Sequence, residues 1–236
     1  MTETLSLIGG LETIRIEDPA APLVVVMAHG FEMEPSDLAP FARSLGVPAV
    51  FLFPQAPLAL ATRGRGWWQI DAAARAAAMA RGPRDLAHEH PAGLDEARER
   101  FDAFWRAAEG IAGDRPLIVG GFSQGGMLTT DTFLRTERRA DALVLLSTSR
   151  LAIDEWTPLA SRLSGLPVLI GHGSADVDLA FSAGEALRGF YESAGAAVTW
   201  VPHDGGHQIP LPVWRRLKKF LLGVDTSRAS QWITRE

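Results

Sequence analysis

The sequence predicts an α/β protein with a mostly parallel central sheet and helices on both faces. Short apolar runs without alternation recur along the chain, and such runs are typical of parallel strands covered on both faces. Segments with helical spacing of apolar residues lie between these runs. Strands that alternate with helices in this way favour a three-layer α/β architecture.

Six apolar runs are the expected parallel strands: residues 22–30, 47–54, 115–123, 141–149, 166–176 and 197–204. An earlier run, residues 11–18, reads "LETIRIED" and alternates apolar with polar residues, which predicts an antiparallel edge strand.

The expected helices fill the intervals between strands. Residues 92–112 have the clearest pattern, because apolar residues recur every three or four positions and charged residues take the other face. A helix capped by Ser36 is expected to end at Gly46. Three more are expected from about Gln124, from about Asp178 to Ser193, and from about Pro212 to Leu222.

Residues 54–91, here called the excursion, interrupt the alternation with prolines, glycines, a Trp-Trp pair and an alanine run. This segment is too long for a simple connection, and we expect a lid-like or pocket-forming element over one end of the sheet. No repeat or linker divides the chain, so residues 1–236 are expected to form a single domain. The polar tail, residues 225–236, is expected to fray unless Trp232 docks it.

Composition narrows the function classes. The formal net charge of -5 argues against nucleic-acid partners and anionic membrane surfaces. The absence of cysteine excludes disulfides, thiolate metal sites and a cysteine nucleophile. The first residues lack the basic character of a signal peptide, and no apolar run has the length of a membrane span. We therefore expect a cytoplasmic protein without stable membrane insertion.

The stretch "VGGFSQGGM", residues 119–127, places Ser123 between Gly121 and Gly125, after a predicted strand and before a predicted helix. Gly-x-Ser-x-Gly in this context is the nucleophile elbow. Side chains at the two glycines would collide with the neighbouring strand and helix. The lysine of a phosphate loop and the spacing of a dinucleotide loop are both missing. The pattern therefore predicts that Ser123 is a nucleophile.

A serine nucleophile needs a base, and the elbow predicts an acid and then a histidine, each following a later strand. Asp176 follows the predicted strand core 166–171, and His207 follows 197–201. Carboxyl ends of parallel strands share one edge of a sheet, so both side chains are expected beside Ser123. His207 would accept the serine proton, and Asp176 would orient the imidazole.

Each of these loops contains a rival. Asp178 could be the acid, although capping the next helix is its simpler role. His203 competes with His207, but Gly205-Gly206 gives the backbone freedom to aim His207. Asp176 and His207 are therefore preferred.

The remaining histidines favour structural roles. His172 is expected to bond the loop backbone. His88 and His90 could bracket a metal, but no third ligand is suggested nearby, and surface histidines are the better interpretation. No metal and no cofactor are expected.

An oxyanion hole would complete the site. One donor is expected to be the backbone N–H of Gln124, the residue after the nucleophile. The second is expected from "AHGF", where Gly30 allows close approach of the backbone and Phe31 supplies the N–H.

Four stretches carry a resemblance to a known family: "VVMAHGFEMEPSDLAPF", "PLIVGGFSQGG", "VLIGHGSADVDLAFSAG" and "HDGGHQIP". In order and spacing, the chain resembles the carboxylesterase/phospholipase family, which includes the acyl-protein thioesterases. The resemblance implies an α/β-hydrolase fold, no cofactor, and hydrolysis of carboxylic esters or thioesters. By position, Ser123, Asp176 and His207 match the family's triad, and Phe31 and Gln124 match its oxyanion donors.

The chain also departs from the family pattern. The family commonly reads Asp-x-Val-Val-Pro after the acid, whereas residues 176–180 read "DVDLA". Residues 72–91 are distinctive as well. Acyl and leaving-group pockets come from such loops, so the natural substrate stays open.

Two features of the excursion bear on substrate. Trp67, Trp68 and Met33 are expected to line an apolar acyl pocket, together with Leu58, Leu60 and Phe31, although the tryptophans could merely pack the excursion onto the sheet edge. Five arginines could attract an anionic leaving group such as a phosphate, but a solvated face paired with local acids is the favoured interpretation: Arg63, Arg65, Arg75, Arg81 and Arg84.

The expected function is a serine hydrolase that acts on a small-molecule ester or thioester through an acyl-enzyme intermediate, as a monomer or homodimer. The alternative from another class is a catalytically silent α/β-hydrolase fold that serves as a binding module. Among enzymes, a lysophospholipase or an acyltransferase would share the same chemistry.

Overall fold

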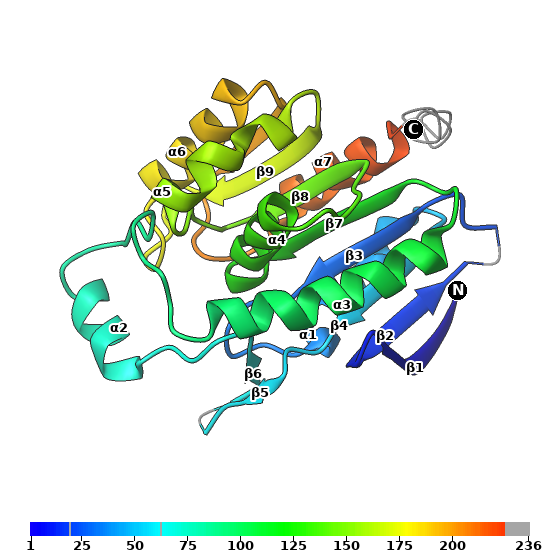
Figure 1. Cartoon of the computed structure of the whole chain (residues 1–236), viewed down its shortest axis with the longest axis horizontal. Coiled ribbons are helices and arrows are strands. Elements are labelled where there is room, and N and C mark those ends of the chain that lie inside the picture. The colour runs from blue at the N-terminus through cyan, green and yellow to red at the C-terminus, as the bar shows by residue number, and fades with distance from the viewer. Residues whose placement is uncertain (19, 62, 225–236) are drawn as a thin grey trace.

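A computed structural model describes residues 1–18, 20–61 and 63–224 of the chain. An eight-stranded sheet with the order β1-β2-β4-β3-β7-β8-β9-β10 forms its centre (Figure 1). The six strands from β4 to β10 in this order run parallel, whereas β1 and β2 are antiparallel. The predicted mostly parallel sheet is confirmed. The expectation for Trp232 concerns residues outside this description.

The strands of the main sheet are β1 (Thr2–Ile8), β2 (Leu11–Glu17), β3 (Val24–Ala28), β4 (Val50–Pro54), β7 (Leu117–Phe122), β8 (Ala142–Leu146), β9 (Pro167–Gly173) and β10 (Ala197–His203). The α-helices are α1 (Pro35–Leu45), α2 (Ala72–Met79), α3 (Leu94–Ala112), α4 (Gln124–Arg135), α5 (Ile153–Trp156), α6 (Phe181–Ser193) and α7 (Leu211–Leu222). A short hairpin, β5 (Leu58–Ala59) and β6 (Arg65–Gly66), and the 3-10 helix η1 (Thr157–Leu163) complete the elements.

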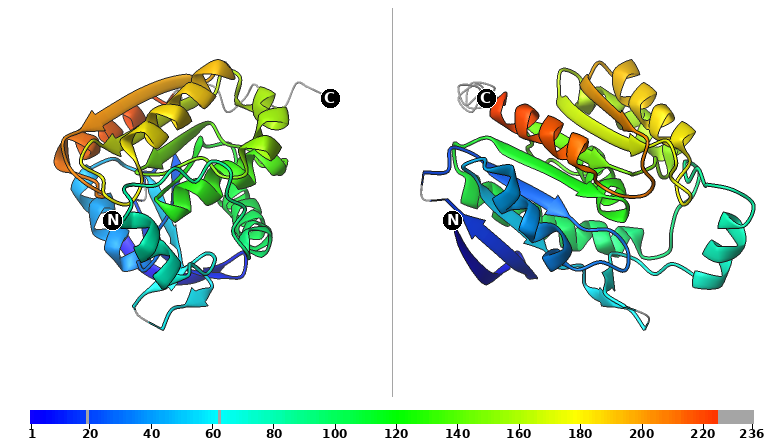
Figure 2. Two further views of the ribbon diagram at one scale, coloured as in Figure 1. Left: turned by 90° about the vertical axis from the view of Figure 1, so that its left-hand side faces the viewer. Right: turned by 180° about the vertical axis from the view of Figure 1, so that it is seen from behind.

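Helices cover both faces of the sheet, as predicted. Alternate residues of β3 point to opposite faces: Val24 packs in one apolar cluster with Phe101 of α3, and Val25 packs in the other with Leu38 of α1 and Leu217 of α7. The right-hand view of Figure 2 shows α1 and α7 together on the second face. Burial on both faces explains why the parallel strands are apolar without alternation.

The edge-strand prediction needs a correction. β2 lies between β1 and β4, and β1 is the outer strand. A two-residue turn joins β1 to β2, and both of its residues, Gly9 and Gly10, have positive φ. β1 buries only Ile8, and its Leu5 and Leu7 are exposed, so the Gly-Gly pair was the main signal of the hairpin.

Two helix starts also differ from expectation. α1 is not capped by Ser36; it begins at Pro35, and the N–H of Glu34 donates to the Asp37 carboxylate at 2.8 Å. α6 begins at Phe181 with Ala180 as its N-cap, and the Asp178 side chain binds arginines of the excursion instead of capping this helix. α5 and η1 lie in a segment for which no element was predicted.

The excursion contains the hairpin β5–β6 and the helix α2, followed by a long loop that leads to α3. α2 has no buried residue. Figures 1 and 2 both place it beyond the carboxyl ends of the parallel strands. That edge of the sheet is where the elbow predicts the active site.

Candidate active site

Ser123 occupies the sharp turn between β7 and α4 with φ 53° and ψ -118°. A residue other than glycine is strained in this conformation. The turn is held by hydrogen bonds on both sides: the Ser123 N–H donates to the Leu146 carbonyl at 2.8 Å, and the Ser123 carbonyl accepts from Gly126 N–H at 3.0 Å. The strained geometry predicted for an elbow is present.

The two flanking glycines are sterically required. A Cβ at Gly121 would lie 2.3 Å from the backbone carbon of Gly125 in α4. A Cβ at Gly125 would lie 2.3 Å from the carbonyl oxygen of Ala28 in β3. Both contacts are with backbone, which cannot move aside cheaply. The predicted collision with the neighbouring helix and strand is confirmed.

Three predicted side chains meet at this turn. His207 Nε2 lies 2.9 Å from Ser123 Oγ, and His207 Nδ1 lies 2.7 Å from Asp176 Oδ2. An ionised carboxylate only accepts hydrogen bonds, so Nδ1 carries the proton and Nε2 is free to accept from the serine hydroxyl. The ring of Phe122 packs at 4.9 Å from the imidazole, centroid to centroid, and helps to hold its position.

The Asp176 carboxylate is buried and well bonded. Its Oδ1 accepts the backbone N–H groups of Asp178 at 2.9 Å and Leu179 at 3.0 Å. Burial raises the pKa of Asp176, but the hydrogen bond and charge of His207 and these two N–H groups outweigh it, so the pKa lies below its ordinary value. The carboxylate therefore stays ionised at neutral pH.

The rivals in the same loops lie elsewhere. Asp178 receives hydrogen bonds from Arg75 and Arg84 of the excursion. His203 Nδ1 accepts the N–H of Gly205 at 3.2 Å. Neither side chain contacts Ser123 or His207 through a hydrogen bond in the described part of the chain.

His172 is the buried structural histidine that was expected. Its Nε2 donates to the Leu179 carbonyl at 3.1 Å, and burial lowers its pKa. His88 and His90 are exposed and lie near Asp154 and Glu155.

The expected oxyanion donors flank the serine. A Cβ at Gly30 would lie 3.2 Å from the Ser123 Cβ, so the Gly30–Phe31 peptide lies against Ser123. Gln124 is the first residue of α4, where N–H groups have no intrahelical partner. Among the described residues, neither the Phe31 N–H nor the Gln124 N–H donates to an acceptor.

His29 is a buried residue beside the candidate site whose contacts the sequence did not indicate. It is fully buried, its Nδ1 donates to the Gly30 carbonyl at 2.8 Å, and its Nε2 accepts the Ala56 N–H at 3.1 Å. Burial lowers the pKa of His29 to about 4, so the ring is neutral at physiological pH. These bonds tie the Phe31 turn to the start of the excursion. The position of His29 before Gly30 in "AHGF" was the available signal.

The side chain of Gln124 has a second role that the sequence did not indicate. Its Oε1 accepts the Trp67 N–H at 2.8 Å, and its Nε2 donates to the Trp68 carbonyl at 3.0 Å. The Trp67 indole donates to the His29 carbonyl at 2.9 Å. The Trp-Trp pair is therefore fixed to the elbow and to the Phe31 turn at once.

A pocket of about 260 Å³, here called the Ser123 pocket, opens beside the serine. Ser123 and His207 line it, and so do the expected substrate contacts Trp68 and Met33. Trp67 does not line it: this side chain is buried against Phe101 and supports the pocket from behind. Leu58 and Leu60, on the hairpin side of the excursion, are not among its lining residues either.

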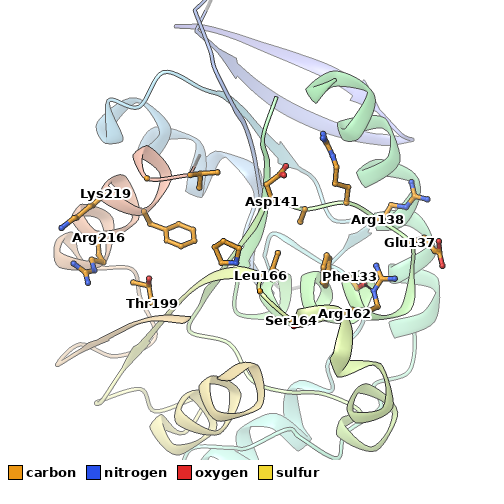
Figure 3. A pocket seen from close by; sticks show the side chains of 17 residues that line it. Phe133, Glu137, Arg138, Asp141, Arg162, Ser164, Leu166, Thr199, Arg216 and Lys219 are labelled. Carbon is orange, nitrogen blue, oxygen red and sulfur yellow. Dashed lines mark hydrogen bonds between the residues drawn. The ribbon is translucent and has the colours of Figure 1, made fainter. Parts of the chain in front are cut away.

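A larger hollow of about 1210 Å³ lies at the opposite edge, by the amino ends of β8 and β9. Figure 3 shows Arg138 and Arg162 on one side of it and Arg216 and Lys219 on the other. Its lining contains Ser164 but no described histidine that could act as a base. The smaller Ser123 pocket is therefore the candidate active site despite its size.

Within the described residues, no three His, Asp or Glu side chains are grouped so that they could hold a metal ion. No described helix is both long and apolar enough to cross a membrane.

Residues 87–224, more than half of the chain, match the family model for phospholipase/carboxylesterase. The chain belongs to the phospholipase/carboxylesterase family. Membership supports an esterase-type hydrolase. A search of curated proteins found no match.

Solved structures with the same fold cover most of this chain. Esterase PE8 is 22% identical, with a TM-score of 0.74 over 95% of this chain and 100% of that one. A carboxylesterase from Mesorhizobium loti is 17% identical, with a TM-score of 0.72 over 94% and 99%. SOBER1 from Arabidopsis thaliana is 20% identical, with a TM-score of 0.65 over 88% and 98%. At these identities the likeness establishes the α/β-hydrolase fold.

Proposed function

We propose that this family member is a serine hydrolase that cleaves carboxylic esters with Ser123 as nucleophile. The observation that carries the proposal is the hydrogen-bonded line from Asp176 through His207 to Ser123, with contacts of 2.7 Å and 2.9 Å. His207 Nε2 would take the hydroxyl proton as Ser123 Oγ attacks the ester carbonyl. Asp176 would hold the imidazole tautomer and stabilise the imidazolium.

The attack converts the carbonyl oxygen into an oxyanion, which would accept from the backbone N–H groups of Phe31 and Gln124. Collapse of the tetrahedral intermediate expels the alcohol, which takes the proton from His207 and leaves the acyl group on Ser123. A water molecule then attacks with the same base, releases the carboxylic acid and restores the serine. A thioester would follow the same steps with a thiol as leaving group, and no cofactor takes part.

The Ser123 pocket is the proposed site for the acyl group, with Met33 and Trp68 as apolar contacts. The excursion would supply one wall of this site. The single domain over residues 1–236, the cytoplasmic location and the monomeric or homodimeric state stay predictions.

Labelling with a fluorophosphonate tests the proposal. The wild-type protein should be labelled at Ser123 and should hydrolyse para-nitrophenyl butyrate, while Ser123→Ala should fold normally and lose hydrolysis by several orders of magnitude. A silent binding module would not be labelled, and near-wild-type turnover by Ser123→Ala would contradict the assignment. A panel of lysophospholipids, acyl acceptors, esters and thioesters would separate the enzymatic alternatives.

A further inference from the structure

Two arginines of the excursion, Arg75 in α2 and Arg84 in the loop after it, line the Ser123 pocket together with Ser123 and His207. Their side chains are largely buried, with exposed fractions of 26% and 17%. Burying a guanidinium is unfavourable unless it is paired and hydrogen-bonded. Their presence in an otherwise mostly apolar pocket therefore needs an explanation.

Of the two acids that pair with these arginines, Asp178 and Glu32, only Asp178 is buried. Both guanidinium groups bind the single buried carboxylate of Asp178. Glu32 lies 3.5 Å from Arg75 Nη1, but its side chain is 38% exposed, and exposed ion pairs contribute little. Two guanidinium groups thus share one buried carboxylate at the pocket wall.

Both arginines are also short of acceptors. A guanidinium carries five N–H donors, and the Nε–H of Arg75 and that of Arg84 are buried with no acceptor in the described part of the chain. An anionic group in the pocket would supply charge-assisted hydrogen bonds to the remaining donors. Apolar neighbours such as Ile70, Leu86 and Leu179 lower the local dielectric, which strengthens such an interaction.

The two arginines are held near the reacting centre before any ligand binds. The Arg84 N–H donates to the Asp178 carbonyl at 2.9 Å, and the Arg84 carbonyl accepts the Ala180 N–H at 2.8 Å. The Arg75 guanidinium carbon lies 6.0 Å from the ring centroid of Phe31, the residue whose N–H faces the oxyanion position in the proposed mechanism. A preorganised cationic site loses less conformational entropy on binding.

We propose that Arg75 and Arg84 form a subsite for an anionic group of the substrate, so that the enzyme prefers small esters that carry a carboxylate or phosphate close to the reacting carbonyl. This inference rests on the proposed function. The pocket of about 260 Å³ has room for a short acyl chain with a charged end.

The test compares two esters that differ only at the chain end. Para-nitrophenyl pentanoate ends in a methyl group, and mono-para-nitrophenyl glutarate has a carboxylate in its place. The wild-type protein should show the higher kcat/KM for the glutarate. Arg75→Gln should lower the ratio of kcat/KM for the glutarate to kcat/KM for the pentanoate about tenfold, because the lost guanidinium binds only the glutarate carboxylate.

Arg81→Gln is the matched control, because Arg81 is an exposed arginine of the same excursion and does not line the Ser123 pocket. It removes the same charge and should leave the preference intact. Equal kcat/KM of the wild-type protein for both esters, or equal losses in the two variants, would overturn the subsite.

A binding experiment separates failure of the subsite from failure of the proposed function. Ser123→Ala protein should bind monomethyl glutarate more tightly than methyl pentanoate in calorimetry, and adding Arg75→Gln should abolish the difference. This result would support the subsite even if neither chromogenic ester were hydrolysed, an outcome that would refute the esterase. Equal binding of both compounds would refute the subsite even in an active enzyme.

Discussion

The imidazole of His207 lies within hydrogen-bond distance of the Ser123 hydroxyl, although 84 residues separate the two in the chain. The contact depends on the backbone of Ser123, whose φ of 53° turns the side chain away from both β7 and α4. Strain at Ser123 is therefore part of the geometry of the candidate site.

That strain can be measured with two variants that lack the Ser123 hydroxyl. Ser123→Gly should be more stable than Ser123→Ala by about 1 kcal/mol. In this conformation the Cβ of alanine is strained, and that strain exceeds the entropic cost of ordering a glycine. Urea unfolding of both proteins gives the difference. Equal stabilities, or a more stable alanine variant, would show that the turn is not strained.

Asp176→Asn should cost on the order of 10⁴ in kcat/KM, as the same change does in a chymotrypsin-type triad. The amide would present a donor to His207 Nδ1 and so favour the wrong tautomer, with the proton on Nε2 facing Ser123. Steady-state kinetics on para-nitrophenyl butyrate measures the loss. Activity within tenfold of wild type would remove Asp176 from the proposed triad.

Asp178→Asn should act mainly on stability. The helix-capping role expected for Asp178 implied a cost of about 1 kcal/mol. Its buried bonds to Arg75 and Arg84 raise the expected cost to about 3 kcal/mol, with a far smaller loss of rate than Asp176→Asn.

The same bonds set a pH dependence for Asp178. Burial raises the pKa of its carboxyl, but the two arginines outweigh burial and hold it below its ordinary value. The stabilisation is therefore present above about pH 4 and is lost as the pH falls through the folded pKa. Urea unfolding of Asp178→Asn and of the wild-type protein at pH 7 measures how much these bonds contribute to the free energy of unfolding. An Asp178→Asn protein that is as stable as wild type, or that loses as much activity as Asp176→Asn, would contradict this structural role of Asp178.

Gln124→Ala should destabilise the protein by about 2 kcal/mol, because it leaves the Trp67 N–H and the Trp68 carbonyl without their partner inside the protein. The backbone donor at position 124 remains, so activity should fall less than in Ser123→Ala. Gln69→Ala is the control, because Gln69 is an exposed glutamine next to the Trp-Trp pair. The Gln69→Ala protein should be as stable as wild type. Similar stability of the two variants would show that the side chain of Gln124 does not fix the Trp-Trp pair.

His29 should make stability fall in mild acid. Its pKa is about 4 in the folded protein and 6.5 as an ordinary histidine, so between these values the unfolded chain binds the extra proton. Unfolding free energy is therefore lost as the pH falls through this window, and His29 accounts for about 2 kcal/mol of loss between pH 7 and pH 5.

His29→Gln isolates that contribution, because His172 and His203 have lowered pKa values as well and contribute in the same direction. The variant should show a loss between pH 7 and pH 5 that is smaller by about 2 kcal/mol, whatever its stability at pH 7. An unchanged loss would mean that His29 is not held neutral by burial.

Much of the site could be predicted because its signals are local. A side chain at Gly121 would clash with the backbone of Gly125, and one at Gly125 would clash with the adjacent strand β3. The glycine spacing around Ser123 therefore has a local steric cause that can be recognised in the sequence. The order of strand ends places Asp176 and His207 at the same edge as Ser123, since parallel strands leave their carboxyl ends together.

Other features depended on partners that no local pattern specifies. The outer strand β1 was missed because Ile8 is its only buried residue, and α2 because it buries nothing. Trp67 was expected in the pocket, but its side chain is buried against Phe101, a residue of the separate helix α3.

The sequence by itself determined the architecture, the sharp turn at Ser123 and the meeting of Ser123, Asp176 and His207 at one sheet edge, because each follows from periodicity, from strand order or from sterics over a few residues. Only the tertiary structure decided what Asp178 and Gln124 bind. The partners of Asp178 are 94 and 103 residues away, and those of the Gln124 side chain are 56 and 57 residues away. Such pairings form when the excursion folds back over the sheet edge, because a buried polar group without a hydrogen-bond partner is unfavourable.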